Sequence, residues 1–234
     1  MLKVLFVAIA LTGCFQANAQ ESTSKQYAKK YEEIIQFYPE INTGTHYVEE
    51  NRSLDGHPFY VSAKIEFGTL TIGDFYFENV LLQYDIWEDW VISFSSVFHQ
   101  RMILNHLKVD SFILNDGSTF VKREKPNGFL FHGNGFYREI VTGEIGLYAK
   151  YQKQKKQESS TIELKRSYEE VVRYFFELEG SLVPVPRKRK LFETLGISKK
   201  LAKQELKRAG LRYKKNKEAY LRTLVNMSNN VHHD

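Results

Sequence analysis

An alternation of apolar and polar positions with a period of two residues runs through most of the chain, from about Thr45 to Val185. Aromatic and β-branched residues supply the apolar positions, and glycine, asparagine or aspartate interrupts the pattern at intervals. Such a pattern is typical of antiparallel strands joined by short turns. It predicts a meander of about ten strands, of which the clearest are 59–72, 75–84, 90–94, 109–114, 119–123, 129–132, 136–142, 145–151, 172–178 and 182–185.

Three short segments between these strands have the composition of hairpin turns: Ile72-Gly73-Asp74, Asn115-Asp116-Gly117 and Thr142-Gly143-Glu144. Glycine, asparagine and aspartate accept the positive φ that tight hairpins need. Residues 152–160, in contrast, are uniformly polar and show no periodicity, which predicts an exposed loop.

Helical spacing replaces the two-residue period near both ends of the chain. Apolar residues in 24–37 recur at helical intervals before Pro39, which predicts an N-terminal helix. In the C-terminal tail, Ser198 and Asn216 are candidate N-caps, and Gly210-Leu211 has the form of a Schellman stop. The predicted inward stripes are Ala202, Leu206 and Ala209 in one helix and Tyr220, Leu221, Leu224 and Val225 in the next, and a shorter helix is predicted over 190–195.

These patterns predict an α+β protein with an N-terminal helix, an antiparallel β-meander and C-terminal basic helices. Residues 20–186 are expected to form a mainly β domain, and residues 187–234 a basic helical tail packed on that domain. Adjacent aromatic residues such as Phe75-Tyr76-Phe77 must point to opposite faces of a strand. Either the sheet is covered on both faces, with the helices on one side, or one face lines an apolar groove that binds a ligand.

The first 19 residues have the pattern of a cleavable signal peptide. Lys3 supplies a positive start, residues 4–13 are uncharged, and Ala17-Asn18-Ala19 fits the small-residue rule for cleavage before Gln20. Export to the periplasm or outer membrane of a bacterial envelope is therefore expected.

Cys14, the only cysteine, offers an alternative processing point. The segment Leu11-Thr12-Gly13-Cys14 also matches the pattern that is cut before a lipid-modified cysteine, so a lipid anchor remains open. Cleavage after Ala19 would instead leave a mature chain without cysteine, with no disulfide-linked partner and no thiolate metal site.

Charge divides the chain into an acidic body and a basic tail. Residues 20–186 hold 18 basic and 24 acidic residues, whereas residues 187–224 hold 14 basic residues and three glutamates. The candidate binding cations are Lys199, Lys200, Lys203, Lys207, Arg208, Lys214 and Lys215. Export excludes a nucleic-acid partner, which leaves an anionic membrane surface or another envelope protein, or simply a solvated helix face resting on the acidic body.

The acidic cluster in residues 84–90 is the candidate for catalysis. Asp85, Glu88 and Asp89 could supply the paired carboxylates of a carbohydrate hydrolase, and Trp87 and Trp90 could stack on a sugar. The alternative interpretation is a polar hairpin turn with both tryptophans packed at the sheet edge. No nucleophile elbow or phosphate loop is present, and the seven histidines show no ligand pair on a rigid element, so no cofactor and no metal are expected.

One family resemblance extends over about residues 45–227. The run from Gly68-x-Leu70 to Tyr84-Asp85, the hairpin from Gly135-Phe136-Tyr137 to Leu147, and the closing basic helices resemble an uncharacterised family of exported proteins of Gram-negative bacteria. The resemblance implies no catalytic residues and no assigned function. The leading hypothesis is a non-enzymatic envelope protein that binds a protein partner or a membrane surface, and the alternatives are a periplasmic carrier of a lipid or other apolar ligand and a carbohydrate hydrolase.

Overall fold

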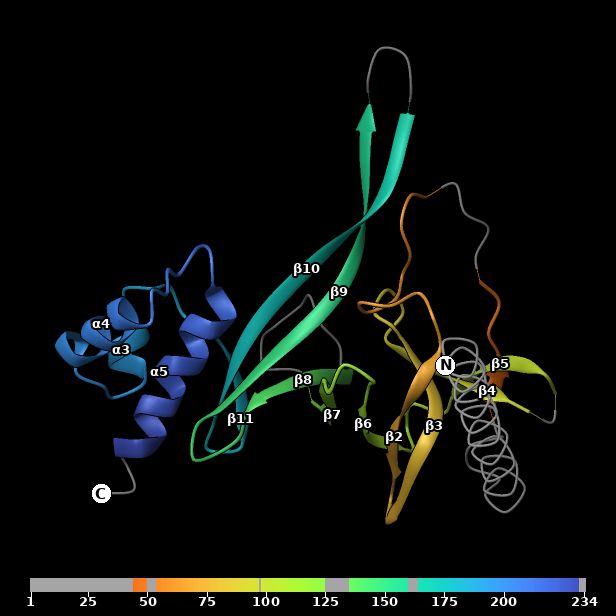
Figure 1. Ribbon diagram of the computed structural model, residues 1–234, viewed down its shortest axis with the longest axis horizontal. Helices are drawn as coiled ribbons and strands as arrows, with labels where there is room; N and C mark the ends of the chain where they lie inside the picture. The colour runs from red at the N-terminus through yellow and green to blue at the C-terminus, as the bar shows by residue number, and fades with distance from the viewer. Residues whose placement is uncertain (1–43, 50–53, 97, 125–134, 160–163, 232–234) are drawn as a thin grey trace, which may run out of the picture.

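The computed structural model describes residues 44–49, 54–96, 98–124, 135–159 and 164–231, whose arrangement Figure 1 shows. These residues form mostly antiparallel sheet with few helices, in agreement with the predicted α+β class. The strands are β1 (Gly44–His46), β2 (Glu66–Ile72), β3 (Phe75–Asp85), β4 (Trp90–Ser95), β5 (Gln100–Leu104), β6 (Val109–Ile113), β7 (Thr119–Arg123), β8 (Gly135–Val141), β9 (Gly146–Ser159), β10 (Leu164–Leu178) and β11 (Ser181–Pro184). The helices are α3 (Leu191–Thr194), α4 (Lys199–Arg208) and α5 (Lys217–Val231). The predicted helix at 24–37 and strand at 129–132 lie outside the described residues.

The strands form a single curled sheet in the order β1-β5-β4-β3-β2-β6-β7-β8-β9-β10-β11. From β6 to β11 this is the expected meander, but β6 pairs with β2 and not with β5. Between β5 and β6 the chain makes a tight turn, in which the Lys108 N–H donates to the Asn105 carbonyl at 2.9 Å. The end of β5 therefore lies beside the start of β6, although three strands separate them in the sheet order, and the sheet must curl.

The curl encloses a core that is rich in aromatic rings. Tyr84 lies 4.8 Å from Phe120 and 5.1 Å from Phe112 between ring centroids, and Phe136 lies 5.1 Å from Phe112. All four residues are almost fully buried. Edge-to-face contacts of this kind add to the hydrophobic free energy of burial. Side chains from β3, β6, β7 and β8 thus fill the concave side of the sheet.

Both faces of the sheet are covered around β8 to β10. Successive residues of β9 enter different clusters: Leu147 packs with the helices, Tyr148 packs with Tyr137 and Phe175 on the opposite face, and Ala149 joins the core inside the curl. For β8 to β10, both faces are thus covered by buried clusters. In β3 the outcome differs, because Phe77 is buried whereas Phe75 is 51% exposed and Tyr76 is 61% exposed.

The interpretation of residues 152–160 as a loop is wrong, because β9 continues to Ser159 and pairs with β10 along its length. This long hairpin projects from the sheet (Figure 1), so its exposed part needs no apolar face and shows no hydrophobic period. Cross-strand charge pairs contribute instead, such as Lys153 with Glu170 at 3.2 Å. For the same reason β10 begins at Leu164, earlier than the predicted 172.

Other boundaries also differ from the predictions. The predicted strand 59–72 begins only at Glu66, and Phe59 makes one isolated bridge with Asp85. Strand β5 was not predicted. The three predicted hairpin turns are confirmed, with positive φ at Gly73, Gly117 and Gly143.

Residues 187–231, which we call the helical unit, pack against the ends of β8 to β11. Leu191, Leu221 and Leu224 are fully buried in one cluster with Leu147 and Phe176 of the sheet. The Asn229 amide bonds both backbone groups of Ile145, accepting from its N–H at 2.9 Å and donating to its carbonyl at 3.1 Å. The helical unit is therefore attached to the sheet by apolar packing and by a buried polar contact.

Candidate functional site

The two ends of helix α4 differ in how they are capped. Ser198 precedes α4 but makes no side-chain capping bond. At the other end, Gly210 has φ of 66° and the Leu211 N–H donates to the Leu206 carbonyl at 2.9 Å, which is the Schellman geometry. Ala209, predicted to lie in the buried stripe, is exposed. The reason is that Ala209 is the C-cap, and Leu211 returns to the apolar cluster in its place.

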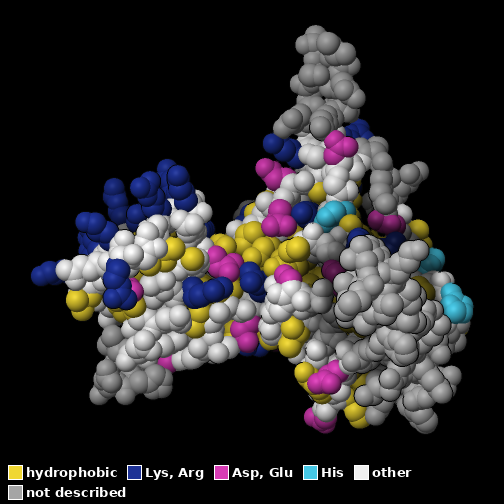
Figure 2. Space-filling model, viewed as in Figure 1, with side chains coloured by type: hydrophobic (Ala, Val, Ile, Leu, Met, Phe, Trp, Pro, Cys, Tyr) yellow, Lys and Arg dark blue, Asp and Glu magenta, His cyan; other side chains and the backbone are white. Residues whose placement is uncertain are grey.

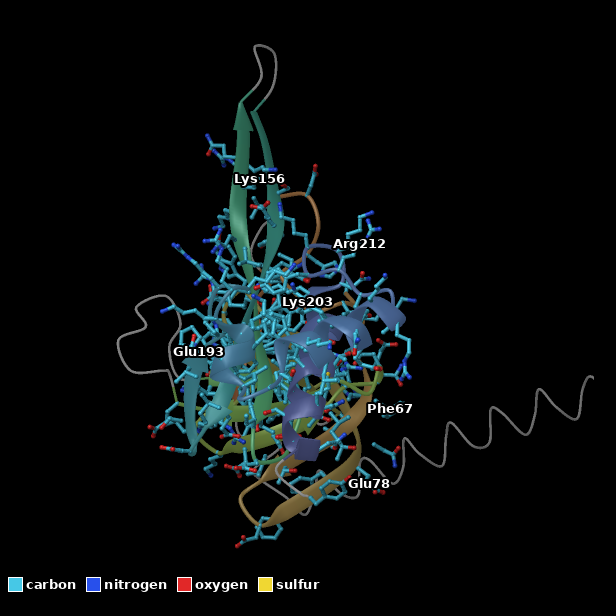
Figure 3. All side chains as sticks on the ribbon, turned by 90° about the vertical axis from the view of Figure 1, so that its left-hand side faces the viewer. Phe67, Glu78, Lys156, Glu193, Lys203 and Arg212 are labelled. Carbon is cyan, nitrogen blue, oxygen red and sulfur yellow. The ribbon has the colours of Figure 1, made fainter. Side chains whose placement is uncertain are left out.

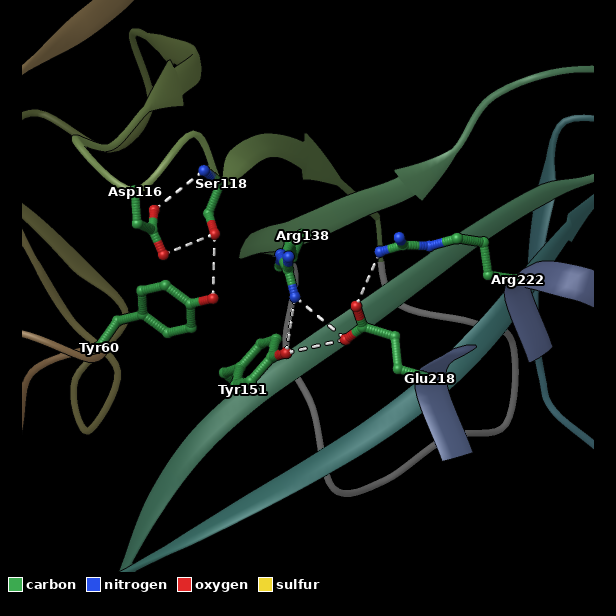
Figure 4. Close-up of polar contacts among 7 residues, drawn as sticks. All are labelled: Tyr60, Asp116, Ser118, Arg138, Tyr151, Glu218 and Arg222. Carbon is green, nitrogen blue, oxygen red and sulfur yellow. Dashed lines mark hydrogen bonds and ion pairs between the residues drawn. The ribbon is translucent and has the colours of Figure 1, made fainter. Parts of the chain in front are cut away.

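Glu218 joins the helical unit to the sheet through a polar network, which we call the latch (Figure 4). Its Oε2 accepts hydrogen bonds from Arg138 of β8 at 3.0 Å and from Tyr151 of β9 at 3.3 Å. Its Oε1 accepts from Arg222 at 3.0 Å. Burial raises the pKa of Tyr151 well above its ordinary value, so the phenol stays protonated and can donate. One of the three glutamates of the basic tail is therefore bonded to the sheet.

The predicted basic residues of the tail all lie on the outside. Lys199, Lys200, Lys203, Lys207, Arg208, Lys214 and Lys215 are all exposed. Lysine and arginine side chains gather over the helical unit in Figure 2, and Figure 3 labels Lys203 and Arg212 on the side of this unit that faces the viewer. Two of the three glutamates are paired with arginines of the same helices, Glu205 with Arg208 and Glu218 with Arg222. The outer face is thus strongly positive.

A groove with about 400 Å³ of space opens on this face, and we call it the basic groove. Its lining has no acidic residue and consists of Lys188, Lys203, Lys207 and Arg212, together with Phe192, Leu206, Gly210, Leu211 and Tyr220. The ammonium group of Lys188 lies 5.8 Å from the Tyr220 ring centroid. The groove therefore has a cationic rim beside apolar and aromatic side chains.

Sequence reasoning found only part of this groove. Lys203 and Lys207 were among the candidate cations, whereas Lys188, Phe192 and Tyr220 were not assigned to a site. Lys188 belongs to a basic run that precedes α3 in the chain, and only the packing of α3, α4 and α5 brings it to the same groove. No pattern in the sequence could have indicated that Lys188 lines the same groove as Lys203 and Lys207.

The acidic cluster occupies the turn between β3 and β4, and its first member has a structural role. Asp85 Oδ1 accepts from the backbone N–H groups of Trp87 at 2.8 Å and Glu88 at 3.1 Å. Asp85 Oδ2 accepts from the Tyr47 hydroxyl at 3.1 Å. Burial raises the pKa of the Asp85 carboxyl, and the three hydrogen bonds oppose that shift in part.

Asp89, in the same turn, is half-buried and forms an ion pair with the buried Lys150 of β9. Lys150 Nζ lies 2.6 Å from Asp89 Oδ2 and donates to the Phe136 carbonyl at 3.0 Å. The Tyr84 hydroxyl also donates to Asp89. Burial lowers the pKa of Lys150, and the nearby Asp89 carboxylate opposes this. A Cβ at Gly135 would overlap the Asp89 carboxylate, so only glycine leaves room for the pair.

The three carboxylates of this cluster do not converge on one point. Asp85 is bonded to its own turn, Asp89 is bonded to Lys150, and Glu88 is exposed. A cleft of about 180 Å³ lies beside them and is lined by Trp87, Trp90, Tyr47, Tyr168 and Asp85, among others. Its aromatic walls already make internal contacts: Lys155 lies 4.7 Å from the Trp87 ring centroid, and Trp87 meets Tyr168 edge-on.

Within the described ranges, no group of three or more His, Cys, Asp or Glu side chains is arranged to hold a metal ion. None of the described helices is long and apolar enough to cross a bilayer. Ala19, Gln20 and Cys14 lie outside the part of the chain that the structure describes. In comparisons with known proteins, no family model, no curated protein and no solved structure matches this chain.

Proposed function

We propose that this protein is an exported, non-enzymatic envelope protein that docks on an anionic membrane surface through its helical unit. The observation that carries the proposal is the strong positive charge on the outer face of that unit. Of its 14 lysines and arginines, thirteen are exposed and only Lys217 is half-buried. Glu205 and Glu218 are paired within the unit, which leaves Glu193 as the one acidic side chain of residues 187–231 without a described ion pair.

The physical basis of docking is Coulomb attraction between these cations and anionic headgroups. Each lysine or arginine near such a surface contributes about 1 kcal/mol, and the effect falls off within a Debye length. In this orientation Leu201, which is 59% exposed on α4 beside Lys200, would face the same surface as the lysines.

The proposal is tested by sedimentation of the protein with vesicles of phosphatidylglycerol and phosphatidylcholine, against vesicles of phosphatidylcholine alone. We expect binding only to the anionic vesicles, weakening steadily as salt is added. The test variant replaces Lys199, Lys200, Lys203 and Lys207 with glutamate. Its bound fraction should fall by about tenfold or more, since each lost cation removes about 1 kcal/mol of attraction.

A matched control replaces Lys64, Lys108, Lys155 and Lys156, four exposed lysines outside the helical unit, with glutamate. It carries the same change in net charge but should keep most of the binding, because these lysines lie outside the helical unit. An equal loss in both variants would show an effect of net charge only and would overturn the proposal. Capture of an acidic envelope protein without vesicle binding would favour the protein-partner alternative.

Export is the second part of the proposal, supported by the pattern of residues 1–19. The mass of the mature N-terminus tests it. A chain that begins at Gln20 indicates a soluble form, and one that begins at a lipid-modified Cys14 indicates a tethered form, in which the anchor and the helical unit both contact a membrane. A full-length chain retained inside the cell would contradict export.

A further inference from the structure

The basic groove has a composition that the rest of the basic face lacks. Elsewhere on the helical unit Arg208 and Arg222 are in ion pairs with glutamates. In the groove, by contrast, Lys203, Lys207, Lys188 and Arg212 line one concave space. None of these four has a described ion pair with an acidic side chain. Their charges are therefore free to act together on one anion.

The apolar side of the groove distinguishes it from a site for a small inorganic anion. Phe192, Leu206, Leu211 and Tyr220 line the same space as the four cations. A fully hydrated anion would gain nothing from these side chains, because burial of apolar surface is favourable only when another apolar group covers it. An amphiphile with an anionic head and adjoining methylene groups would satisfy both parts.

The size of the groove limits how much of such an amphiphile it can hold. About 400 Å³ lies at the lower end of the range for small-molecule sites and matches a headgroup with the first carbons of its chains. Whole acyl chains would remain in the bilayer. Arg212 can bond two phosphate oxygens at once through its planar guanidinium, and the lysines add point charges around it.

The groove is also built in advance of binding. The Schellman bond from the Leu211 N–H to the Leu206 carbonyl fixes the chain at the end of α4, next to Lys207. The ring of Tyr220 is 4% exposed and meets the Tyr213 ring edge-on, and Lys188 lies over both rings. A preformed site loses less conformational entropy when it binds.

From these observations we infer that the basic groove is a specific site for the phosphate headgroup of an anionic glycerophospholipid. The inference rests on the proposed function, since it names the molecule that the docking surface would bind. It adds that one groove, and not the overall charge, selects the lipid.

The experiment is a titration of the ¹⁵N-labelled mature chain with dihexanoylphosphatidic acid below its micelle concentration, followed by amide shifts. We expect saturable shifts at Phe192, Leu206 and Tyr220. The groove variant Lys207→Ala/Arg212→Ala should bind about tenfold more weakly or worse, because it loses two charge-assisted contacts. The matched control Lys64→Ala/Lys108→Ala loses the same charge at exposed positions outside the helical unit and should bind as the unchanged protein does. Amide spectra of both variants without lipid confirm that they are folded.

Further probes distinguish the sources of the anion. Inorganic phosphate and dihexanoylphosphatidylcholine should both bind much more weakly than dihexanoylphosphatidic acid, the first because it has no apolar part and the second because its head is neutral overall. Equal binding of inorganic phosphate would overturn the lipid assignment. Tighter binding of an oligoglutamate peptide would assign the groove to an acidic peptide and would overturn it as well.

Failure of this inference is distinguishable from failure of the proposed function. If both alanine variants bind anionic vesicles and the soluble lipid equally, the groove has no special role, although docking by the basic face stands. If the soluble lipid binds in the groove but the protein does not bind vesicles, the groove is a headgroup site and surface docking is wrong.

Discussion

In the curled sheet, the charged residues nearest the core are bonded to other protein groups, whereas in the helical unit nearly all of the cations project into solvent. Lys150 is 2% exposed and paired with Asp89, and Asp85 is 2% exposed and bonded to its own turn. Lys203, Lys207 and Arg212 lie on the outside with no described acidic partner. A charge that is already paired and desolvated has little left to offer a ligand, while an unpaired exposed charge does. The difference therefore favours binding at the helical unit and structural roles for the acidic cluster.

Replacing Lys150 with alanine should have the largest effect on stability. The substitution leaves the Asp89 carboxylate without its cation and the Phe136 carbonyl without the Lys150 donor. Because the Lys150 side chain is 3% exposed and that of Asp89 is 28% exposed, we expect a loss of about 3 kcal/mol, the lower end of the range for fully buried pairs. Urea unfolding followed by circular dichroism measures this. The double variant Asp89→Asn/Lys150→Met, which removes both charges, should recover much of the loss. If Lys150→Ala unfolds at the same urea concentration as the unchanged protein, the pair is not structural and the comparison between the two regions fails.

Glu218 of the latch resembles the acidic residues of the sheet, because it is bonded to side chains that are distant in the sequence. We expect Glu218→Ala to lower the free energy of unfolding by about 1–3 kcal/mol, since it leaves Arg138 and Tyr151 without their shared acceptor. The matched control is Glu205→Ala, which removes only an exposed pair with Arg208 within α4 and should cost under about 0.5 kcal/mol. Both are measured by chemical denaturation. Similar losses for the two variants would show that the latch does not differ from a surface ion pair.

The smallest expected effect concerns Asp85 and appears in the pH dependence of stability. Burial raises the pKa of Asp85 in the folded state above its ordinary value of 3.8. In the window between 3.8 and that higher value, the folded state binds more protons than the unfolded state, so stability falls as pH rises through it. The Asp85→Asn variant lacks this titration, and its carbonyl can still accept the turn N–H groups.

Unfolding of the two proteins at several pH values across the acidic range tests this. We expect the stability of Asp85→Asn relative to the unchanged protein to improve as pH rises through the window and to stay constant above it. A relative stability that worsens over the same range would mean that the ionised carboxylate is favoured in the folded state, contrary to its burial.

Local structure was predictable where residue type or a regular apolar period specified it. The turns at Gly73, Gly117 and Gly143 were found because their residue types accept positive φ, and the buried stripe of α5 was found because its apolar residues recur at helical spacing. A strand with neither face buried has no such apolar period. The outer part of the β9–β10 hairpin is polar on both faces, and its strands are held by backbone pairing that no side-chain pattern records.

The sequence by itself determined the fold class, the short-range turns and the separation of charge along the chain, since each depends on residues close together in sequence. The tertiary structure decided which charges matter. Packing of the β3–β4 turn against β9 paired Asp89 with Lys150, 61 residues apart, and so gave one member of the candidate catalytic cluster a bonded partner within the protein. Packing of α3, α4 and α5 brought Lys188 and Arg212 to one groove. Electrostatic and hydrophobic interactions depend on how far apart two groups lie in space. That separation cannot be read from the number of residues between them.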